Sequence, residues 1–435
     1  MTSGSPGLRW RACLALAAAI ALYSGSPTTS AFHDQIAAPP SPDSRTETRA
    51  LWVLRSSLAT PASITALVRS AREHGFNTLL VQVRGRGDAY FRGGIEPLPA
   101  ELLRQPDSFD PLAAALQAAH AAGLHVHAWV NVNLISSAVE LPSAREHLVY
   151  RHPGWLMVPR DIAQDMAKTE IESPAYLGKL ARWTRTQSSE IEGLYASPLI
   201  PEAAEYLESI VRDLARRYPL DGLHFDYARY PTDRFDYSRP ALRQFRAAVR
   251  TGLPVDDRRR LDAQEAVDLF AYADGLPERW RAFRVERMTA LIRRLRDAAK
   301  GERPGALVTV AAAPDARDAY EHRLQDWRRW LADGLIDALC PMAYTTEASK
   351  FAEQIAAARE AAGTRTAVWA GIGAWRLPAK ETIDNIQTAR RLGASGVILF
   401  SYDSLIDPRQ PVPDYLGLVG RAAFAASVPP AQGSR

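Results

Sequence analysis

An acidic side chain near the end of an apolar segment is the feature of this sequence best suited to chemistry. The segment Asp221 to Pro231 reads Asp-Gly-Leu-His-Phe-Asp-Tyr-Ala-Arg-Tyr-Pro, a turn dipeptide followed by alternating bulky residues and a polar, aromatic end. In a strand, His224, Asp226 and Ala228 would share one face. We predict Asp226 as a catalytic acid or base, the alternative being a structural acid that pairs with Arg229 or caps a turn.

Polar and aromatic residues also follow the other predicted strands. Such residues suit sugar recognition, because sugar rings stack on aromatic faces and hydroxyls take hydrogen bonds. We predict as substrate-binding residues Arg84, Asn131, His224, Tyr227, Arg229, Tyr230, Tyr344, Trp369 and Tyr402. Trp375 follows the predicted strand that contains Trp369, and packing is the alternative for any single tryptophan of this group.

Short apolar segments alternate with amphipathic ones along the chain and would position these residues. Parallel strands need crossover helices, so the alternation predicts an α/β fold, a closed (β/α)8 TIM barrel, with long insertions after strands 3 and 4. The predicted strands are 49–57, 78–84, 125–134, 222–227, 307–313, 336–344, 366–372 and 396–402. An open doubly wound sheet is the alternative, and the first strand is not followed by the glycine motif of a dinucleotide-binding sheet.

The N-terminus has the pattern of a targeting segment. Arg9 and Arg11 precede an apolar run, residues 13–22, that is too short to span a bilayer comfortably. We predict a signal peptide at 1–31, a flexible linker at 32–48, the barrel domain at 49–425 and a disordered tail at 426–435. The mature protein would be periplasmic or secreted without a stable membrane span, the alternative being an uncleaved anchor.

Composition limits the partners of this chain. The formal net charge of +4 is too small to favour nucleic acid or a membrane surface as partner.

His125 and His127 would project together from one strand as a metal pair does, but they stand at the start of that strand, far from Asp226. We therefore expect no metal site and no cofactor. The sequence does not indicate an oligomeric state.

Five motifs, in order, resemble the glycosyl hydrolase-like 10 family, formerly a domain of unknown function. They are Arg49-Ala-Leu-Trp52, Gly75 to Arg84 with Gly87-Asp-Ala-Tyr90, His127-Ala-Trp-Val-Asn131, Asp221 to Asp226 with Tyr230-Pro231, and Gly396 to Ser401. The resemblance runs from about Arg49 to Asp403. It implies an exported barrel-type glycoside hydrolase that acts on a bacterial polysaccharide, with Asp226 at the centre of its site.

The central segment is also similar to the Asp-Gly-x-Asp-x-Asp-x-Glu strand of family 18 chitinases. Ala228 stands at the position of the catalytic glutamate, so the chitinase mechanism cannot be carried over. Glycoside cleavage ordinarily requires a second group besides the proton donor. Asp88 and Asp403 are our further catalytic candidates, while Glu347 and Asp315 also follow strands. Sequence leaves this partner open, together with the choice between retaining and inverting chemistry.

The leading hypothesis is a hydrolase of O-glycosidic bonds in bacterial glycan, with peptidoglycan strands as the substrate. A carbohydrate-binding barrel that has lost its proton donor is the main alternative, because Ala228 replaces the expected acid. A polysaccharide deacetylase is disfavoured, since no convincing set of metal ligands is present.

Overall fold

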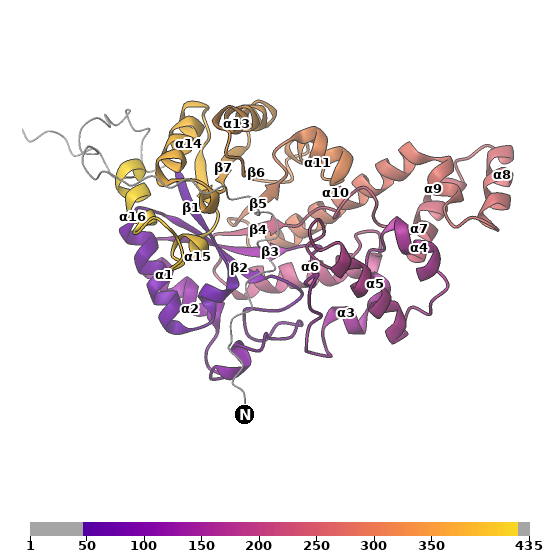
Figure 1. Cartoon of the computed structure of the whole chain (residues 1–435), viewed down its shortest axis with the longest axis horizontal. Coiled ribbons are helices and arrows are strands. Elements are labelled where there is room, and N and C mark those ends of the chain that lie inside the picture. The colour runs from indigo at the N-terminus through magenta and orange to yellow at the C-terminus, as the bar shows by residue number, and fades with distance from the viewer. Residues whose placement is uncertain (1–46, 425–435) are drawn as a thin grey trace, which may run out of the picture.

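The computed structural model describes residues 47–424 and is built around a closed barrel of eight parallel strands, which confirms the predicted fold (Figure 1). Neighbouring strands in sequence are neighbours in the barrel, and β8 closes against β1. The strands are β1 (Thr48–Val53), β2 (Thr78–Arg84), β3 (His125–Asn131), β4 (Gly222–Asp226), β5 (Leu307–Ala312), β6 (Ala338–Ala343), β7 (Ala367–Ile372) and β8 (Gly396–Leu399). The predicted signal peptide, most of the linker and the tail lie outside the described residues.

Helices cover the outside of the barrel. The larger ones are α1 (Pro61–Glu73), α2 (Pro111–Ala121), α6 (Pro201–Arg217), α10 (Pro277–Glu302), α13 (Ala348–Ala362) and α14 (Ala379–Arg391). Proline at the first turn and a capping side chain begin α1 and α2, with Thr60 and Asp110 as the capping residues. Outward strand residues such as Val81 and Phe225 belong to the main hydrophobic core between the strands and these helices.

Inward strand residues fill the barrel with a second, smaller core. Its buried members include Trp52, Trp129, Cys340 and Trp369, with Ile398 from β8. The strand alternation places His224 and Asp226 on the same inward side, while Phe225 between them faces the helices. Pairing of Asn131 with Asp226 brings the ends of β3 and β4 together at the end of the barrel that we call the mouth.

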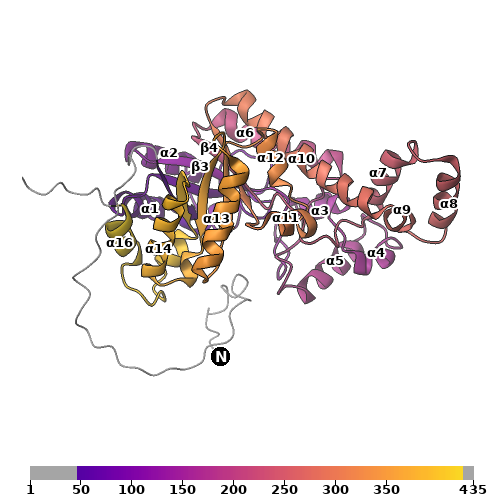
Figure 2. The same ribbon diagram turned by 90° about the horizontal axis from the view of Figure 1, so that it is seen from above.

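The two insertions form one lobe beside the barrel, and Figure 1 and Figure 2 both show it projecting to one side. Its helices are α3 (Leu148–Arg151), α4 (Arg160–Met166), α5 (Pro174–Thr186), α7 (Arg239–Arg250), α8 (Val255–Glu265) and α9 (Ala271–Gly275). The backbone N–H of Val158 donates to Asp236 at 2.8 Å, and Arg160 forms an ion pair with Asp274 at 2.7 Å. Trp280 and Phe245 lie in the hydrophobic core of this lobe. No helix among residues 47–424 is long and apolar enough to cross a membrane.

Four stretches differ from the predicted elements. The first and third predicted strands extend to residues 57 and 134, but β1 ends at Val53, before a 3-10 helix at Arg55–Leu58, and β3 ends at Asn131. The last predicted strand ran to Tyr402, but β8 ends at Leu399 and Tyr402 begins the short helix α15 (Tyr402–Leu405). Ser401 caps this helix, a change of structure that a continuous apolar run conceals. Helix α11 (Ala316–His322), before α12 (Trp327–Ala332), is absent from the predicted elements. It is capped by Asp315, whose side chain accepts a hydrogen bond from the N–H of Asp318 at 2.8 Å.

Candidate active site

Asp226 ends β4 at the mouth, with 9% of its side chain exposed. Its carboxylate accepts a hydrogen bond from the backbone N–H of Tyr227 at 2.6 Å, and a guanidinium nitrogen of Arg229 lies 3.4 Å away. Burial raises the pKa of Asp226, while Arg229 and the N–H of Tyr227 oppose that rise. Glu192 also raises this pKa through charge repulsion. A carboxyl held in this way is suited to carry a proton.

Arg229 connects Asp226 to a second carboxylate that sequence reasoning missed. Its other terminal nitrogen lies 3.4 Å from Glu192, and the hydroxyl of Tyr195 donates to the same carboxylate at 2.7 Å. Although burial alone would raise it, the pKa of Glu192 is lowered, because Arg229 and Tyr195 stabilise the ionised form. The two carboxyl groups are therefore shifted in opposite directions, as an acid and its ionised partner require.

Glu192 reaches the mouth because the first insertion returns along the segment after β3. The backbone N–H of Ile135 donates to the carbonyl oxygen of Leu194 at 2.9 Å, and that of Ala138 donates to the backbone carbonyl oxygen of Glu192 at 3.0 Å. A side chain on Gly193 would collide with the carbonyl oxygen of Ser136 at 1.7 Å, so only glycine allows this approach. A glycine directly after the acid is the local signal that could have drawn attention to Glu192, but it does not show that Glu192 meets Arg229.

Tyr227 follows Asp226 with an uncommon backbone conformation. Its φ of 52° lies in the left-handed region, which is unfavourable for a bulky residue. The guanidinium of Arg229 lies 4.2 Å from the centre of the Tyr227 ring, and Tyr195 meets the same ring edge-on at 6.1 Å. The turn after β4 thus gathers Tyr227 and Arg229, both predicted as substrate contacts, around Asp226.

An aromatic wall lies at the mouth beside strands β6 to β8. Trp375 is 37% exposed and meets Tyr344 edge-on at 5.1 Å and Phe400 at 5.4 Å. Tyr344, a predicted substrate contact, is half-buried and also meets Trp52 of the barrel interior at 6.1 Å. An exposed indole backed by further rings has the form of a sugar-stacking surface.

Four other predicted substrate contacts are buried away from the mouth surface. His224 lies one layer below Asp226, accepts a hydrogen bond from the indole of Trp52 at 3.0 Å, and contacts Thr309 at 2.9 Å. Burial holds the pKa of His224 well below its usual range, so the ring is neutral. The remaining three, each at most 4% exposed, are Tyr230, Trp369 and Tyr402. Their substrate-binding roles stay predictions, and their burial favours packing.

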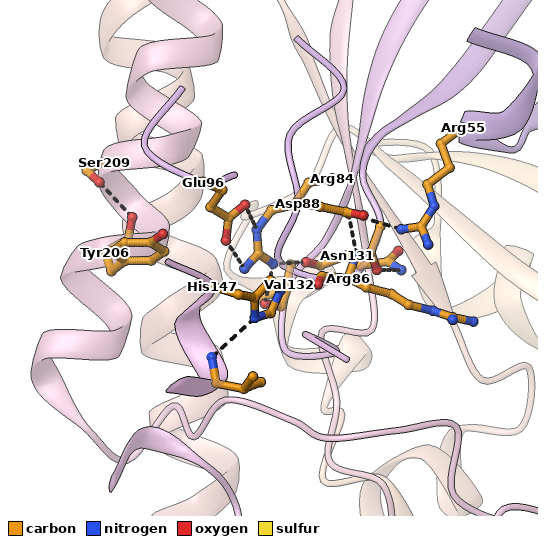
Figure 3. Close-up of polar contacts among 12 residues, drawn as sticks. Arg55, Arg84, Arg86, Asp88, Glu96, Asn131, Val132, His147, Tyr206 and Ser209 are labelled. Carbon is orange, nitrogen blue, oxygen red and sulfur yellow. Dashed lines mark hydrogen bonds and ion pairs between the residues drawn. The ribbon is translucent and has the colours of Figure 1, made fainter. Parts of the chain in front are cut away.

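Arg84 ends β2 inside a closed network, drawn in Figure 3. It donates to both carboxylate oxygens of Glu96 at 2.8 and 2.7 Å, and to the carbonyls of Asn131 and Val132. The amide of Asn131 is occupied as well, since it donates to Gly85 at 2.7 Å and accepts from the indole of Trp129 at 2.8 Å. These contacts favour a supporting role, and direct substrate binding by Arg84 and Asn131 stays a prediction.

The two other predicted catalytic acids, Asp88 and Asp403, already have hydrogen-bond partners within the protein. Asp88 lies in the loop after β2, where its carboxylate accepts from Arg55 at 3.0 Å and from the N–H of Arg86 at 2.9 Å (Figure 3). Asp403 accepts hydrogen bonds at 2.7 Å from the backbone of Leu54 and the hydroxyl of Ser57. The donors around Asp403 fix the end of β1, so the structure does not bring Asp403 into contact with Asp226.

The two histidines weighed as a metal pair point to different places. His125 is exposed at the far end of the barrel and lies 3.3 Å from Asp221. His127 is buried, and the centre of its ring lies 5.4 Å from that of Trp369. Asp221 also contacts His120 at 2.8 Å. Within residues 47–424, no cluster of three or more histidine, cysteine or acidic side chains has the arrangement of a metal site.

Comparison with known proteins finds relatives of the predicted kind. Glycosyl hydrolase DigH of Escherichia coli K12 is 26% identical over 288 residues, covering 62% of this chain and 55% of DigH. Glycosyl hydrolase YngK of Bacillus subtilis is 23% identical over 295 residues, covering 64% of this chain and 48% of YngK. This chain therefore spans about half the length of these relatives.

Solved structures share the barrel. The glycoside hydrolase domain of PgaB from Bordetella bronchiseptica aligns with a TM-score of 0.60 at 18% identity, covering 87% of this chain and all of that domain. The catalytic domain of a Paenibacillus polymyxa β-amylase aligns with a TM-score of 0.56 at 11% identity, covering 87% of this chain and 98% of that domain. The model of the glycosyl hydrolase-like 10 family matches residues 47–386, so this chain belongs to that family.

Proposed function

We propose that this protein is a glycoside hydrolase that cleaves O-glycosidic bonds in a bacterial polysaccharide, specifically the glycan strands of peptidoglycan. The observation that carries the proposal is Asp226, a recessed carboxyl with a raised pKa at the barrel mouth, which also carries an exposed aromatic wall. Family membership supports a carbohydrate substrate. The choice of peptidoglycan follows from the sequence resemblance and the predicted export.

Asp226 would act as the proton donor to the glycosidic oxygen. Departure of an alkoxide from a sugar is slow unless a proton reaches that oxygen as the bond to the anomeric carbon breaks. Burial keeps a proton on Asp226 over a wider pH range than on an exposed aspartate, and Trp375 offers a face on which a neighbouring sugar ring stacks. Together these groups bind a pyranose and protonate its leaving group.

The second candidate is a carbohydrate-binding barrel without turnover. It is favoured by Ala228, which occupies the position of the chitinase glutamate and is fully buried. Binding of glycan strands without any product would support this candidate. Any product that depends on Asp226 would exclude it.

Digestion of purified glycan strands, with products identified by mass, tests the proposal. We expect shorter strands carrying one added water for each bond cleaved, whereas a lytic transglycosylase would release products one water lighter. Asp226→Asn should release no product while melting at a temperature no lower than the original protein. Chitin oligosaccharides serve as the comparison glycan, and absence of product from every glycan offered would contradict the proposal.

Export is part of the proposal and rests on the arginines and apolar run of residues 9–22. Fractionation of cells that express the full chain should find the protein outside the cytoplasm. Replacement of Arg9 and Arg11 by glutamate should retain it inside. Equal distribution of both forms would count against the export signal.

A further inference from the structure

The barrel mouth holds a second carboxylate with the properties that the partner of Asp226 needs. We infer that Glu192, contributed by the first insertion rather than by a barrel strand, is the second catalytic carboxylate. The inference rests on the proposed glycosidase function and assigns a residue to its open role. It takes that role away from Asp88 and Asp403, the candidates that follow strands.

A single guanidinium limits how far apart the two carboxyl groups can be. Arg229 lies 3.4 Å from Asp226 through one terminal nitrogen and 3.4 Å from Glu192 through the other. The contacted oxygens are thus at most about 9 Å apart, which is below the upper limit of about 9.5 Å for the carboxyl pairs of glycosidases. The corresponding contacts of Asp88 and Asp403 lead to Arg55 and to the end of β1 instead.

Glu192 is also the more accessible of the two acids. Its side chain is 39% exposed, against 9% for Asp226. Tyr195 holds one of its oxygens at 2.7 Å, while the contact of the other with Arg229 is long, at 3.4 Å. This arrangement fixes the side chain in place and leaves the Arg229-facing oxygen weakly engaged.

The charges divide the two roles. Arg229 and the Tyr195 hydroxyl favour the ionised form of Glu192, and its negative charge in turn favours the protonated form of Asp226. As the bond from the anomeric carbon to the glycosidic oxygen breaks, Asp226 gives its proton to that oxygen. The anomeric carbon bonds either to a Glu192 oxygen or to a water whose proton Glu192 accepts. In the first case water later releases the sugar and returns a proton to Asp226.

Rescue by a small anion tests this assignment directly. Glu192→Ala should lose at least about 100-fold in glycan-cleaving activity, because an acid/base or nucleophilic group contributes this much or more. Sodium azide, which fits the space left by the carboxylate, should restore cleavage and yield a glycosyl azide detectable by mass. Glu192→Gln, which keeps an acceptor for Tyr195, should be equally inactive, remain folded and show no rescue, since the amide fills the space.

Asp88→Asn is the matched control, because Asp88 is another carboxylate held by an arginine at the mouth. It should keep more than about one-tenth of the activity and form no glycosyl azide, in contrast to the loss expected of a general acid or base. A Glu192→Ala protein that stays active would overturn the inference. So would a folded, inactive Glu192→Ala protein that azide does not rescue, since Glu192 would then act only by positioning Arg229.

The same measurements separate this inference from the proposed function. If the original protein releases no product, the glycosidase proposal fails. If it releases product and Asp226→Asn does not, while Glu192→Ala remains active, the glycosidase proposal stands and only the assignment of Glu192 fails.

Discussion

Two buried arginines at neighbouring parts of the mouth differ in how they use their charge. Arg84, fully buried at the end of β2, donates twice to Glu96, whose side chain is 2% exposed, and also to two backbone carbonyls (Figure 3). Arg229, after β4, is shared between two carboxylates at 3.4 Å each, one of them 39% exposed. Both arginines face acids, but only Arg229 contacts its acids at long distances, which leaves the Arg229-facing oxygen of Glu192 weakly engaged.

We propose that this difference separates a structural ion pair from a set of groups that takes part in chemistry. The ion pair of Arg84 with Glu96 holds both side chains in their charged states. It also fixes the loops after β2 and β3, to which Glu96 and the contacted carbonyl of Val132 belong.

At Arg229 the pKa values of the two acids are shifted in opposite directions: burial and the charge of Glu192 raise that of Asp226 against the opposing effect of Arg229, whereas Arg229 and Tyr195 lower that of Glu192 although burial would raise it. An arginine near the end of a strand is therefore not by itself evidence of a substrate contact. What matters is whether all of its N–H donors already have partners within the protein.

Removal of the structural pair should have the largest effect. Arg84→Met leaves Glu96 buried without its partner, and we expect the free energy of unfolding to fall by about 3–5 kcal/mol. Urea denaturation measures this loss. Arg212→Met, which breaks an exposed ion pair with Glu208 on α6, should cost at most about 1 kcal/mol. Equal losses of unfolding free energy in the two variants would contradict a structural role for the buried pair of Arg84 and Glu96.

Replacement of the shared arginine should affect turnover more than stability. In Arg229→Lys one compact charge cannot contact both Asp226 and Glu192, so we expect kcat to fall by about 30- to 100-fold, as for misplacement of a catalytic group. Arg250→Lys is the control, because it alters an arginine paired with Asp262 at 2.8 Å on the lobe. An unchanged kcat in Arg229→Lys would show that the simultaneous contact of Arg229 with Asp226 and Glu192 is not part of the mechanism.

The aromatic wall should contribute binding rather than chemistry. Trp375→Ala removes the exposed ring, and we expect KM for glycan strands to rise by about 3- to 10-fold with kcat unchanged, from the typical strength of ring stacking. Leu103→Ala, at an apolar residue that is 67% exposed, should leave KM unchanged. An effect of Trp375→Ala on kcat alone would place the indole in the chemical step.

The smallest expected effect is a gain in stability on removal of the negative charge of Asp226. The folded-state pKa of Asp226 is raised, so its stabilising contribution is complete below the unfolded pKa of about 3.9 and is lost as pH rises through the folded value. Asp226→Asn resembles the protonated form at every pH. Its melting temperature should therefore match the original protein near pH 3.5 and exceed it increasingly above that. A lower melting temperature at pH 7 would contradict the raised pKa.

Sequence predicted the barrel well because the pattern is local. All eight strands alternate with helices as expected, since inward and outward residues follow the two-residue period. The inward placement of Asp226 follows from the same period. His224 shares that face but lies about 6.6 Å deeper, one layer down, which periodicity alone does not distinguish from the mouth.

The remainder of the site depends on contacts that no local pattern encodes. Glu192 lies in an insertion loop and meets Arg229 only because residues 191–195 run beside residues 134–138. Arg84 is engaged within the protein because it pairs with Glu96. Glu96 lies in the loop after β2, where no periodic pattern of residues predicts the contact. Both are tertiary contacts, and both change the role of an arginine that the sequence presents in the same way.

The central claim is that chemistry resides at Asp226 and not at the neighbouring saturated pair. Its most direct test is the glycan-cleaving activity per folded molecule of Asp226→Asn beside Glu96→Gln, both measured well below their melting temperatures. We predict that Asp226→Asn is folded and loses about 100- to 10,000-fold in activity, whereas Glu96→Gln melts earlier but cleaves at a rate close to the original. Retained cleavage by folded Asp226→Asn would contradict the account.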